Sequence, residues 1–218
     1  MTAQSKTMLD VNDNENGYQR RRRETRRVLM EAGRSLFIEK AIDQVSIESI
    51  TAAAGVAKGS FYNHFESRDA LYDELIELTI AVLMEKYEAY EPQVEDPLAQ
   101  AHARARFTFY TLLSDPQACR LLLQGGQPER GGAIDRVLRM VLADRLSEGV
   151  ALGTLSHIDL ELVYAAYFGL VTETIGHLLT REEGFDAAWA ADQVSDLCFA
   201  VLGLPHTSPT EKSLEVRT

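Results

Sequence analysis

Cysteine is scarce in this sequence of 218 residues, which contains only Cys119 and Cys198. Two isolated cysteines cannot form the dense disulfide framework of a small secreted protein, and they suit a reducing compartment. A redox-active or metal-binding cysteine pair is the alternative interpretation. We expect a cytoplasmic protein in which neither cysteine has a chemical role.

Long apolar runs are also missing from the chain. No run reaches the roughly 18 residues needed to cross a bilayer. Residues 1–17 lack the apolar core of a secretory signal, and they are rich in Asn, Asp and Gln. We expect no membrane segment and no signal peptide. Residues 1–17 and 205–218 are interpreted as polar, disordered tails.

Motifs for catalysis and for cofactor binding are absent as well. The sequence contains no nucleophile elbow, phosphate-binding loop, zinc-spaced His and Cys cluster or dinucleotide fingerprint. Carboxylates are plentiful, but their spacing is typical of solvated helix surfaces. The sequence therefore predicts a protein that is not an enzyme and that has no cofactor and no metal site.

Alternation of apolar and polar residues, which would indicate β-strands, does not persist anywhere. Helical periodicity, proline and glycine instead divide the chain into helices, so the predicted fold class is all-α. The expected helices cover residues 18–40, 47–54, 57–65, 67–90, 98–113, 117–124, 133–152, 158–180 and 186–202.

The net charge of −11 is unevenly distributed along the chain. Residues 18–72 contain ten Lys or Arg and seven Asp or Glu, a net charge of +3, so the remainder carries −14. A small basic module on an acidic body can meet phosphates while the body is repelled from them. The acidic total therefore does not exclude a nucleic-acid partner.

The most informative stretch is Ile47 to Arg68, which reads IESITAAAGVAKGSFYNHFESR. Ile47, Ile50 and Ala54 have helical spacing, Ser46 can cap that helix, and Gly55 can end it in a left-handed conformation. A second short helix follows, with Phe61 and Phe65 on its apolar face. Two short helices joined by a glycine turn form a helix-turn-helix, whose second helix fits the DNA major groove.

This stretch resembles the DNA-binding signature of the tetracycline-repressor (TetR) family. The resemblance is carried by Ile50, Ala54-Gly55-Val56, Lys58-Gly59, Phe61-Tyr62, His64-Phe65 and Arg68. With the preceding helix it covers about a quarter of the chain. The alternative is a helical hairpin without a role in DNA binding.

Four positions depart from the family pattern. The family usually has glycine at Ala41 and threonine at Val45, often serine at Ala57, and more usually alanine at Thr51. Ala41 would be strained in a left-handed conformation. Val45 removes a hydroxyl that could meet a phosphate, and Ala57 removes a helix cap.

The resemblance and side-chain chemistry together predict the DNA contacts. Lys58 can meet a phosphate or a guanine, Tyr62 a phosphate or a thymine methyl, and Asn63 an adenine. His64 and Arg68 are assigned to the phosphate backbone, and the arginines at 20–23, 26 and 27 to phosphates or the minor groove. A solvated basic helix end is the alternative for those arginines. The predicted DNA-binding residues are Arg22, Arg23, Ser46, Lys58, Gly59, Ser60, Tyr62, Asn63, His64 and Arg68.

The last two expected helices are candidates for self-association, because family members usually dimerise through them. A two-fold dimer reads a palindrome, whereas one chain reads a half-site. A monomeric core that uses the same residues is the alternative. The small residues are Ala165, Ala166, Gly169, Gly176, Ala187, Ala188, Ala190 and Ala191, and the large ones are Tyr167, Leu170, Val171, Trp189, Val194, Leu197 and Val201.

The resemblance also implies a small-molecule effector that binds the body and releases the DNA. Polar or aromatic residues on apolar helices are candidates for its pocket, although a residue of this kind is more often part of the core or surface than a ligand contact. These candidates are His102, Phe109, Tyr110, Gln117, Tyr164, Phe168, Thr172 and His177.

The sequence thus predicts a DNA-binding domain at residues 18–68 and an effector-binding and dimerisation domain at residues 69–204. The expected function is a homodimeric transcriptional repressor that an effector releases from a palindromic operator. A DNA-binding activator or architectural factor without effector control is the alternative. An enzyme and a purely helical interaction module are the other classes to be weighed.

Overall fold

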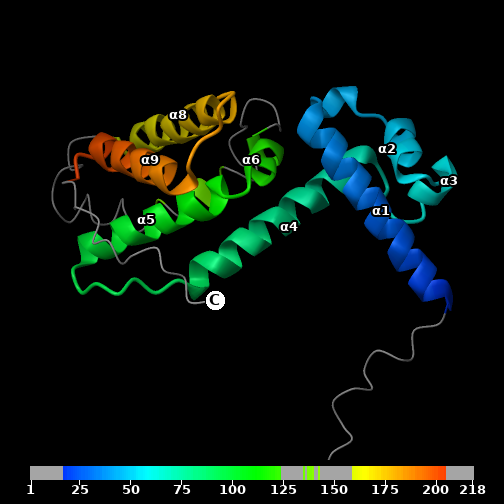
Figure 1. Ribbon diagram of the computed structural model, residues 1–218, viewed down its shortest axis with the longest axis horizontal. Helices are drawn as coiled ribbons and strands as arrows, with labels where there is room; N and C mark the ends of the chain where they lie inside the picture. The colour runs from blue at the N-terminus through cyan, green and yellow to red at the C-terminus, as the bar shows by residue number, and fades with distance from the viewer. Residues whose placement is uncertain (1–16, 124–134, 136, 140–141, 143–158, 205–218) are drawn as a thin grey trace, which may run out of the picture. The chain divides into compact units, whose positions relative to one another are not determined.

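The computed structural model describes residues 17–123, 135, 137–139, 142 and 159–204. Every regular element in these ranges is a helix, which confirms the predicted all-α class. The elements are α1 (Gly17–Glu39), the 3-10 helix η1 (Ile42–Gln44), α2 (Ile47–Ala54), α3 (Lys58–Phe61), α4 (Arg68–Ala89), α5 (Pro97–Leu113), α6 (Pro116–Leu123), α8 (Leu160–Leu179) and α9 (Ala187–Val201) (Figure 1). Most of the helix expected at 133–152 lies outside the described residues.

The chain divides into two compact units, which we call the N-terminal unit (residues 1–73) and the C-terminal unit (residues 74–218). The division falls within α4, between Asp73 and Glu74. The domain boundary predicted from the sequence, after Arg68, lies at the first residue of that helix.

The core of the N-terminal unit consists of one face of α1 packed against the residues around α2 and α3. Leu29 and Phe37 of α1 are fully buried, as are Ile50 of α2 and Phe61 of α3. Phe37 also meets Tyr72 edge to face, with ring centroids 5.1 Å apart. This core fixes the position of α2 and α3 on α1.

Aspartate caps begin several helices of the C-terminal unit. The carboxylates of Asp96, Asp159 and Asp186 accept hydrogen bonds from backbone N–H groups in the first turns of α5, α8 and α9. Such caps satisfy donors that a helix start leaves without a partner, and they place negative charge at the positive end of the helix dipole. These caps account for the helix starts that the sequence predicted within one or two residues.

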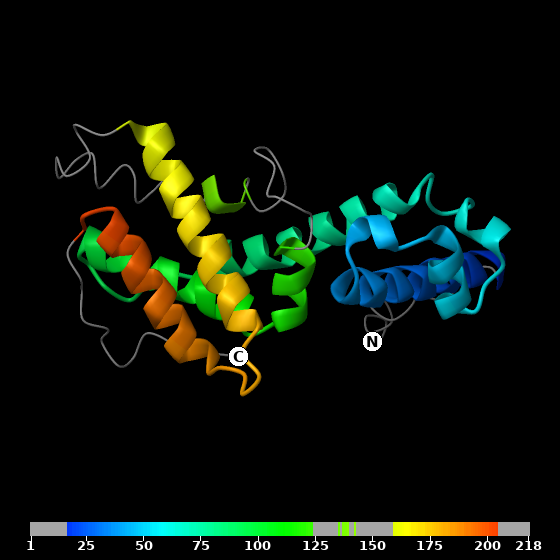
Figure 2. The ribbon, with the colours of Figure 1, turned by 90° about the horizontal axis from the view of Figure 1, so that it is seen from above.

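The core of the C-terminal unit lies between α5, α8 and α9, with α9 beside both of the others (Figures 1 and 2). Phe109 of α5, Tyr167 and Val171 of α8, and Val194 of α9 are all buried there. An ion pair between Arg106 and Asp192 joins α5 to α9. Cys119 and Cys198 are buried in this interior, and neither forms a disulfide within the described residues.

Among the described helices, α8 alone is long and apolar enough to cross a membrane by length and composition. The sequence contained no uninterrupted run of that length because Glu161 and Glu173 lie within the helix. A core helix of a soluble protein passes the same test, and α8 buries Tyr167, Val171 and Ile175 against the other helices.

Candidate nucleic-acid interface

Two serines fix the start of α2. The Ser49 backbone N–H donates to Ser46 Oγ, and the Ser46 backbone N–H donates to Ser49 Oγ, both at 3.1 Å. This reciprocal arrangement is a capping box with serine in place of the usual Glu or Gln. Ser46, which was predicted to contact DNA, therefore has a structural role in this unit whether or not it also meets a phosphate.

Gly55 makes the turn after α2 in a left-handed conformation, with φ of 67°. Its N–H and that of Val56 bond back to the carbonyls of Ala52 and Thr51. The family usually has glycine where this chain has Ala41, but a glycine is not needed there, because Ala41 has an ordinary φ of −56°. The predicted glycine turn is therefore observed, and the substitution at Ala41 causes no strain.

Replacing Gly55 with alanine is expected to lower the free energy of unfolding by about 1–2 kcal/mol, because a Cβ disfavours a left-handed backbone. Gly59 is the matched control, since its φ is not positive and a Cβ added there meets no atom within 4 Å. Urea unfolding of Gly55→Ala and Gly59→Ala measures both effects. A Gly59→Ala protein that is destabilised as much as Gly55→Ala would contradict this account.

The second helix of the motif is shorter than predicted. The sequence predicted a helix from Ala57 to Phe65, whereas α3 contains only Lys58–Phe61 and is followed by a turn. Ala57 supplies no side-chain cap, and Gly59 and Ser60 are weak helix formers. The Phe65 N–H still donates to the Phe61 carbonyl at 3.0 Å, so the chain keeps one helical hydrogen bond beyond α3.

The residues of α3 and the following turn separate into a buried face and an exposed face. Phe61 and Phe65 are buried, as predicted, with ring centroids 5.6 Å apart. The other face carries Lys58, Gly59, Tyr62 and Asn63, which are exposed, and Ser60 and His64, which are half-buried. The structure therefore brings six of the predicted DNA-binding residues together on one surface.

The arginines of α1 have different environments. Arg20, Arg21, Arg22 and Arg23 are exposed. The Arg26 guanidinium stacks over the Phe65 ring, 4.7 Å from its centroid, which ties α1 to the end of the motif. Arg27 is paired with Glu24 and Glu31. Arg22 and Arg23 thus stay predicted phosphate contacts, and the contacts of Arg26 and Arg27 give these two residues a structural role as well.

Arg68 and Val45 have structural roles that the sequence did not indicate. The Arg68 guanidinium donates to the Val45 carbonyl at 3.2 Å and to Asp69 Oδ1 at 2.8 Å. Val45 itself is buried, so its side chain belongs to the core and does not replace a phosphate-binding hydroxyl at the surface. Arg68 thus anchors the segment before α2. A phosphate bound by Arg68 would share its guanidinium with the Val45 carbonyl and the Asp69 carboxylate.

Lys58 is paired with Glu48, ten residues earlier on α2. The pairing raises the pKa of Lys58 and lowers the pKa of Glu48, because each charge favours the other, so both groups are ionised at neutral pH. Glu48 was not among the predicted site residues, since no local pattern shows that the turn at Gly55 directs it toward Lys58.

His64 lies close to two arginines of α1. Burial lowers its pKa from the usual value, and the positive charges of Arg22 and Arg26 lower it further. The imidazole is therefore neutral at pH 7 in the free protein. The negative charge of a phosphate beside the imidazole would raise the pKa of His64, because it favours the protonated ring.

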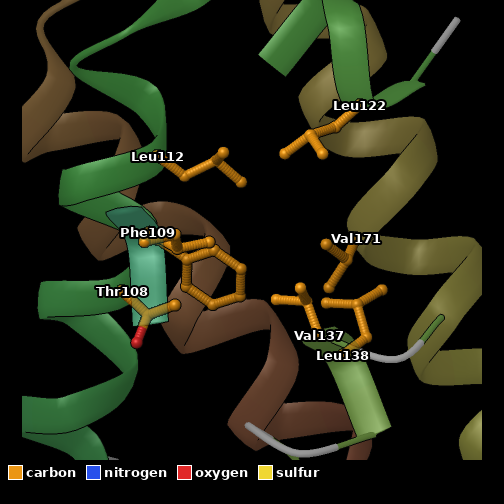
Figure 3. A pocket seen from close by; sticks show the side chains of 8 residues that line it. Thr108, Phe109, Leu112, Leu122, Val137, Leu138 and Val171 are labelled. Atoms are coloured by element: carbon orange, nitrogen blue, oxygen red, sulfur yellow. The ribbon is translucent and has the colours of Figure 1, made fainter. Parts of the chain in front are cut away.

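An apolar cavity in the C-terminal unit is the candidate site for a small molecule (Figure 3). Among the described residues that line it, Thr108 alone has a polar side chain, and its hydroxyl donates to the Arg104 carbonyl at 2.7 Å. The cavity is lined by Leu83, Thr108, Phe109, Leu112, Leu122, Val137, Leu138 and Val171. No group of three or more metal-ligating side chains occurs within the described ranges.

Of the predicted effector-binding residues, Phe109 lines this cavity, and the others lie elsewhere. His102 is buried against the Phe199 ring, and the Tyr164 hydroxyl donates to Asp135 Oδ1 at 2.5 Å. The Thr172 hydroxyl donates within its own helix. Tyr110 and Phe168 are half-buried, and Gln117 and His177 are exposed. The assignment of these residues to an effector stays a prediction.

The predicted dimerisation helices carry exposed apolar side chains. These are Leu160 and Leu162 on α8 and Trp189, Leu197 and Val201 on α9. Ala165 and Ala166 are exposed beside them, whereas Ala190 and Ala191 are buried in the core. Large exposed apolar side chains gathered on two helices are typical of an interaction surface.

Comparisons with known proteins agree with this geometry. A family model described as bacterial regulatory proteins of the tetR family matches residues 29–75. The HTH-type transcriptional repressor DhaR of Mycobacterium sp. (strain GP1) is 44% identical over 52 residues, which are 24% of this chain and 26% of DhaR. The HTH-type transcriptional repressor KstR2 of Mycobacterium tuberculosis (strain ATCC 25618 / H37Rv) is 25% identical over 147 residues, which are 62% of this chain and 72% of KstR2.

The chain spans only about a quarter of the length of the first curated relatives that it matches. Solved structures resemble this chain over most of its length. Their sequence identity is about 20%, so the resemblance shows the fold and not the function. The fatty acid degradation regulator FadR from Bacillus halodurans has a TM-score of 0.61 at 20% identity, covering 81% of this chain and 97% of FadR. SmeT, the repressor of the Stenotrophomonas maltophilia multidrug efflux pump SmeDEF, has a TM-score of 0.60 at 19% identity, covering 85% of this chain and 98% of SmeT.

The family model matches the helix-turn-helix that the sequence indicated, and the likeness in fold to FadR from Bacillus halodurans covers 81% of this chain. The segment at residues 29–75, which contains the helix-turn-helix, thus matches the tetR family of bacterial regulatory proteins.

Proposed function

We propose that this chain is a cytoplasmic, homodimeric transcriptional repressor that binds palindromic operator DNA. The observation that carries the proposal is the surface formed by α3 and the following turn, where six residues suited to DNA contact lie together. Residues 18–72, which include this surface, carry a net charge of +3 on a chain of −11. The positive charge favours phosphates, and the polar and aromatic side chains of α3 can reach base edges.

The names of the matched relatives support a repressor in preference to an activator. DhaR and KstR2 are both described as HTH-type transcriptional repressors. A repressor needs a means of release, and the apolar cavity of the C-terminal unit supports an effector with an apolar portion. FadR from Bacillus subtilis, a structural neighbour at 19% identity, has been solved in complex with stearoyl-CoA, which makes an acyl chain a reasonable first probe.

Release follows from differential binding. An effector that prefers a dimer whose recognition helices no longer match the operator shifts the population toward that conformation. Its maximal effect is limited by the ratio of its affinities for the two conformations. The effector does not need to approach the DNA.

The test is fluorescence-anisotropy binding to labelled DNA flanking the protein's own gene, measured over a series of salt concentrations. Specific binding by the dimer with a dissociation constant in the range of about 10⁻⁸–10⁻¹¹ M, weakening steeply as salt increases, would support the proposal. Stearoyl-CoA is then titrated into the complex, with coenzyme A as the control. Weak binding that is the same for every duplex, including fragments selected from the whole genome, would contradict the proposal.

The affinity for operator DNA is expected to increase as the pH falls. The pKa of His64 is lowered in the free protein, and a neighbouring phosphate would raise it, so binding takes up a proton. Affinity should therefore be constant well above the pKa of the bound form. It should rise by as much as tenfold per pH unit between the two pKa values, and should level off below the pKa of the free form.

Anisotropy titrations from pH 8 to pH 5.5 at fixed ionic strength measure this effect, with His64→Gln as the control. Glutamine keeps a hydrogen-bonding side chain but does not titrate, so its binding should lack this increase. An identical pH profile for both proteins would show that another group is responsible.

A further inference from the structure

The ion pair between Glu48 and Lys58 places a carboxylate beside the surface of α3 and the following turn, which is proposed to contact DNA bases. Lys58 is the first residue of α3, and Glu48 lies in the first turn of α2. Both side chains are largely exposed, at 55% for Lys58 and 62% for Glu48. Exposed ion pairs contribute little to stability, so the fold itself gives little reason for this pair.

The pair changes what Lys58 offers to DNA. An isolated lysine ammonium neutralises a phosphate and releases a counterion, which gives affinity for any sequence. Beside Glu48 the same ammonium belongs to a unit without net charge, and the carboxylate repels phosphate oxygens. The pair therefore weakens sequence-independent binding through Lys58.

The same pair suits the edge of one kind of base pair. In the major groove, guanine presents the acceptors O6 and N7, and the paired cytosine presents the donor N4–H₂. An ammonium has three donors, so Lys58 can keep its bond to Glu48 and still donate to guanine. A carboxylate has several acceptor positions, so Glu48 can accept from cytosine while it holds Lys58.

We propose that Glu48 is a specificity-determining residue, which together with Lys58 reads a G·C base pair and disfavours phosphate contact. The inference rests on the proposed operator binding, and it adds a residue outside α3 to the reading surface. In this account Glu48 lowers the affinity for DNA in general and raises the ratio of specific to non-specific binding.

Selection from a random duplex library tests the base preference and does not require the operator sequence to be known. The wild-type chain should enrich a palindrome with one position per half-site restricted to G·C. Glu48→Gln, which keeps the size of the side chain but removes its charge, should relax that position alone. The preference for G·C there is expected to fall by about tenfold or more, as for other base contacts of this kind.

The salt dependence tests the effect on phosphate contact. On a duplex without the enriched sequence, Glu48→Gln should bind more tightly than the wild type. The slope of log K against log salt should steepen by about 0.9, the value for one additional neutralised phosphate. In a Lys58→Ala background the same substitution should leave the slope unchanged, because the effect acts through Lys58.

Glu39→Gln is the matched control, since it removes the same charge from an exposed residue at the end of α1. A Glu48→Gln protein whose enriched sequence and salt slope equal those of Glu39→Gln would overturn the inference while leaving the proposed function intact. An effect of Glu48→Gln that persists without Lys58 would also overturn it. A wild-type chain that binds no duplex at low salt would overturn the proposed function, and this inference with it.

Discussion

Replacing Leu197 with glutamate is expected to convert the protein to a monomer and to lower its operator affinity by more than 100-fold. Leu197 is 45% exposed on α9, four residues from Val201, and both belong to the apolar surface proposed for dimerisation. A charge buried there without a partner costs several kcal/mol, which corresponds to more than two orders of magnitude in the dimer equilibrium. A monomer then loses the second half-site, whose contribution through effective concentration is typically 10²–10⁴-fold.

Sedimentation equilibrium measures the oligomeric state, and fluorescence anisotropy measures the operator affinity. Leu78→Glu is the matched control, because Leu78 is a leucine of similar exposure, 49%, on α4. This control should remain dimeric and should bind DNA as the wild type does. A Leu197→Glu protein that stays dimeric at micromolar concentration would place the dimer interface elsewhere.

The sequence indicated that α8 and α9 carry the surface proposed for dimerisation, but it did not show which face of each helix is exposed. Small and large apolar residues occur all around α8 and α9, so their periodicity gives no clear inner side. The structure assigns Tyr167, Val171 and Val194 to the core, and leaves Trp189 and Leu197 exposed. Which side chains are buried depends on how α5 packs against α8 and α9, and α5 lies far from both helices in the sequence.

The helix-turn-helix was predicted more completely because its signals are local. The Ser46 cap, the left-handed Gly55 and the burial of Phe61 and Phe65 each depend on a few neighbouring residues. The Glu48–Lys58 pair crosses the turn, so it depends on the angle between two helices, which the sequence pattern does not determine. For the same reason the sequence could not show that Arg68 bonds to the Val45 carbonyl.

The apolar cavity, which is the candidate effector site, was the least predictable part of the described structure. Its apolar lining comes from α4, α5, α6, α8 and residues 137–138, and no local motif unites these segments. Polar and aromatic side chains were expected to line it, because ligand contacts often require them. Six of the eight described residues that line the cavity are instead Leu or Val, and among the predicted residues only Phe109 lines it.

Phe61 and Tyr62 are adjacent aromatic residues whose replacement by alanine should have different consequences. Phe61 is fully buried, and its ring centroid lies 5.6 Å from that of Phe65. Phe61→Ala removes a core ring and leaves a cavity, so the free energy of unfolding should fall by about 3–5 kcal/mol. Since many domains have only about 5–15 kcal/mol of stability, this change should also abolish DNA binding by displacing α3.

Tyr62 is 54% exposed, so Tyr62→Ala should change the free energy of unfolding by less than about 1 kcal/mol. Its operator affinity should nevertheless fall by about tenfold or more, because the ring and hydroxyl are lost from the surface proposed to contact DNA. Tyr62→Phe separates the two groups: a phosphate contact through the hydroxyl predicts weakened binding, and a thymine contact through the ring predicts retained binding. Urea unfolding and anisotropy on the same preparations give both quantities. If Tyr62→Ala bound the operator as tightly as the wild type while Phe61→Ala lost both stability and binding, α3 would be a structural element and the DNA contacts would lie on other residues.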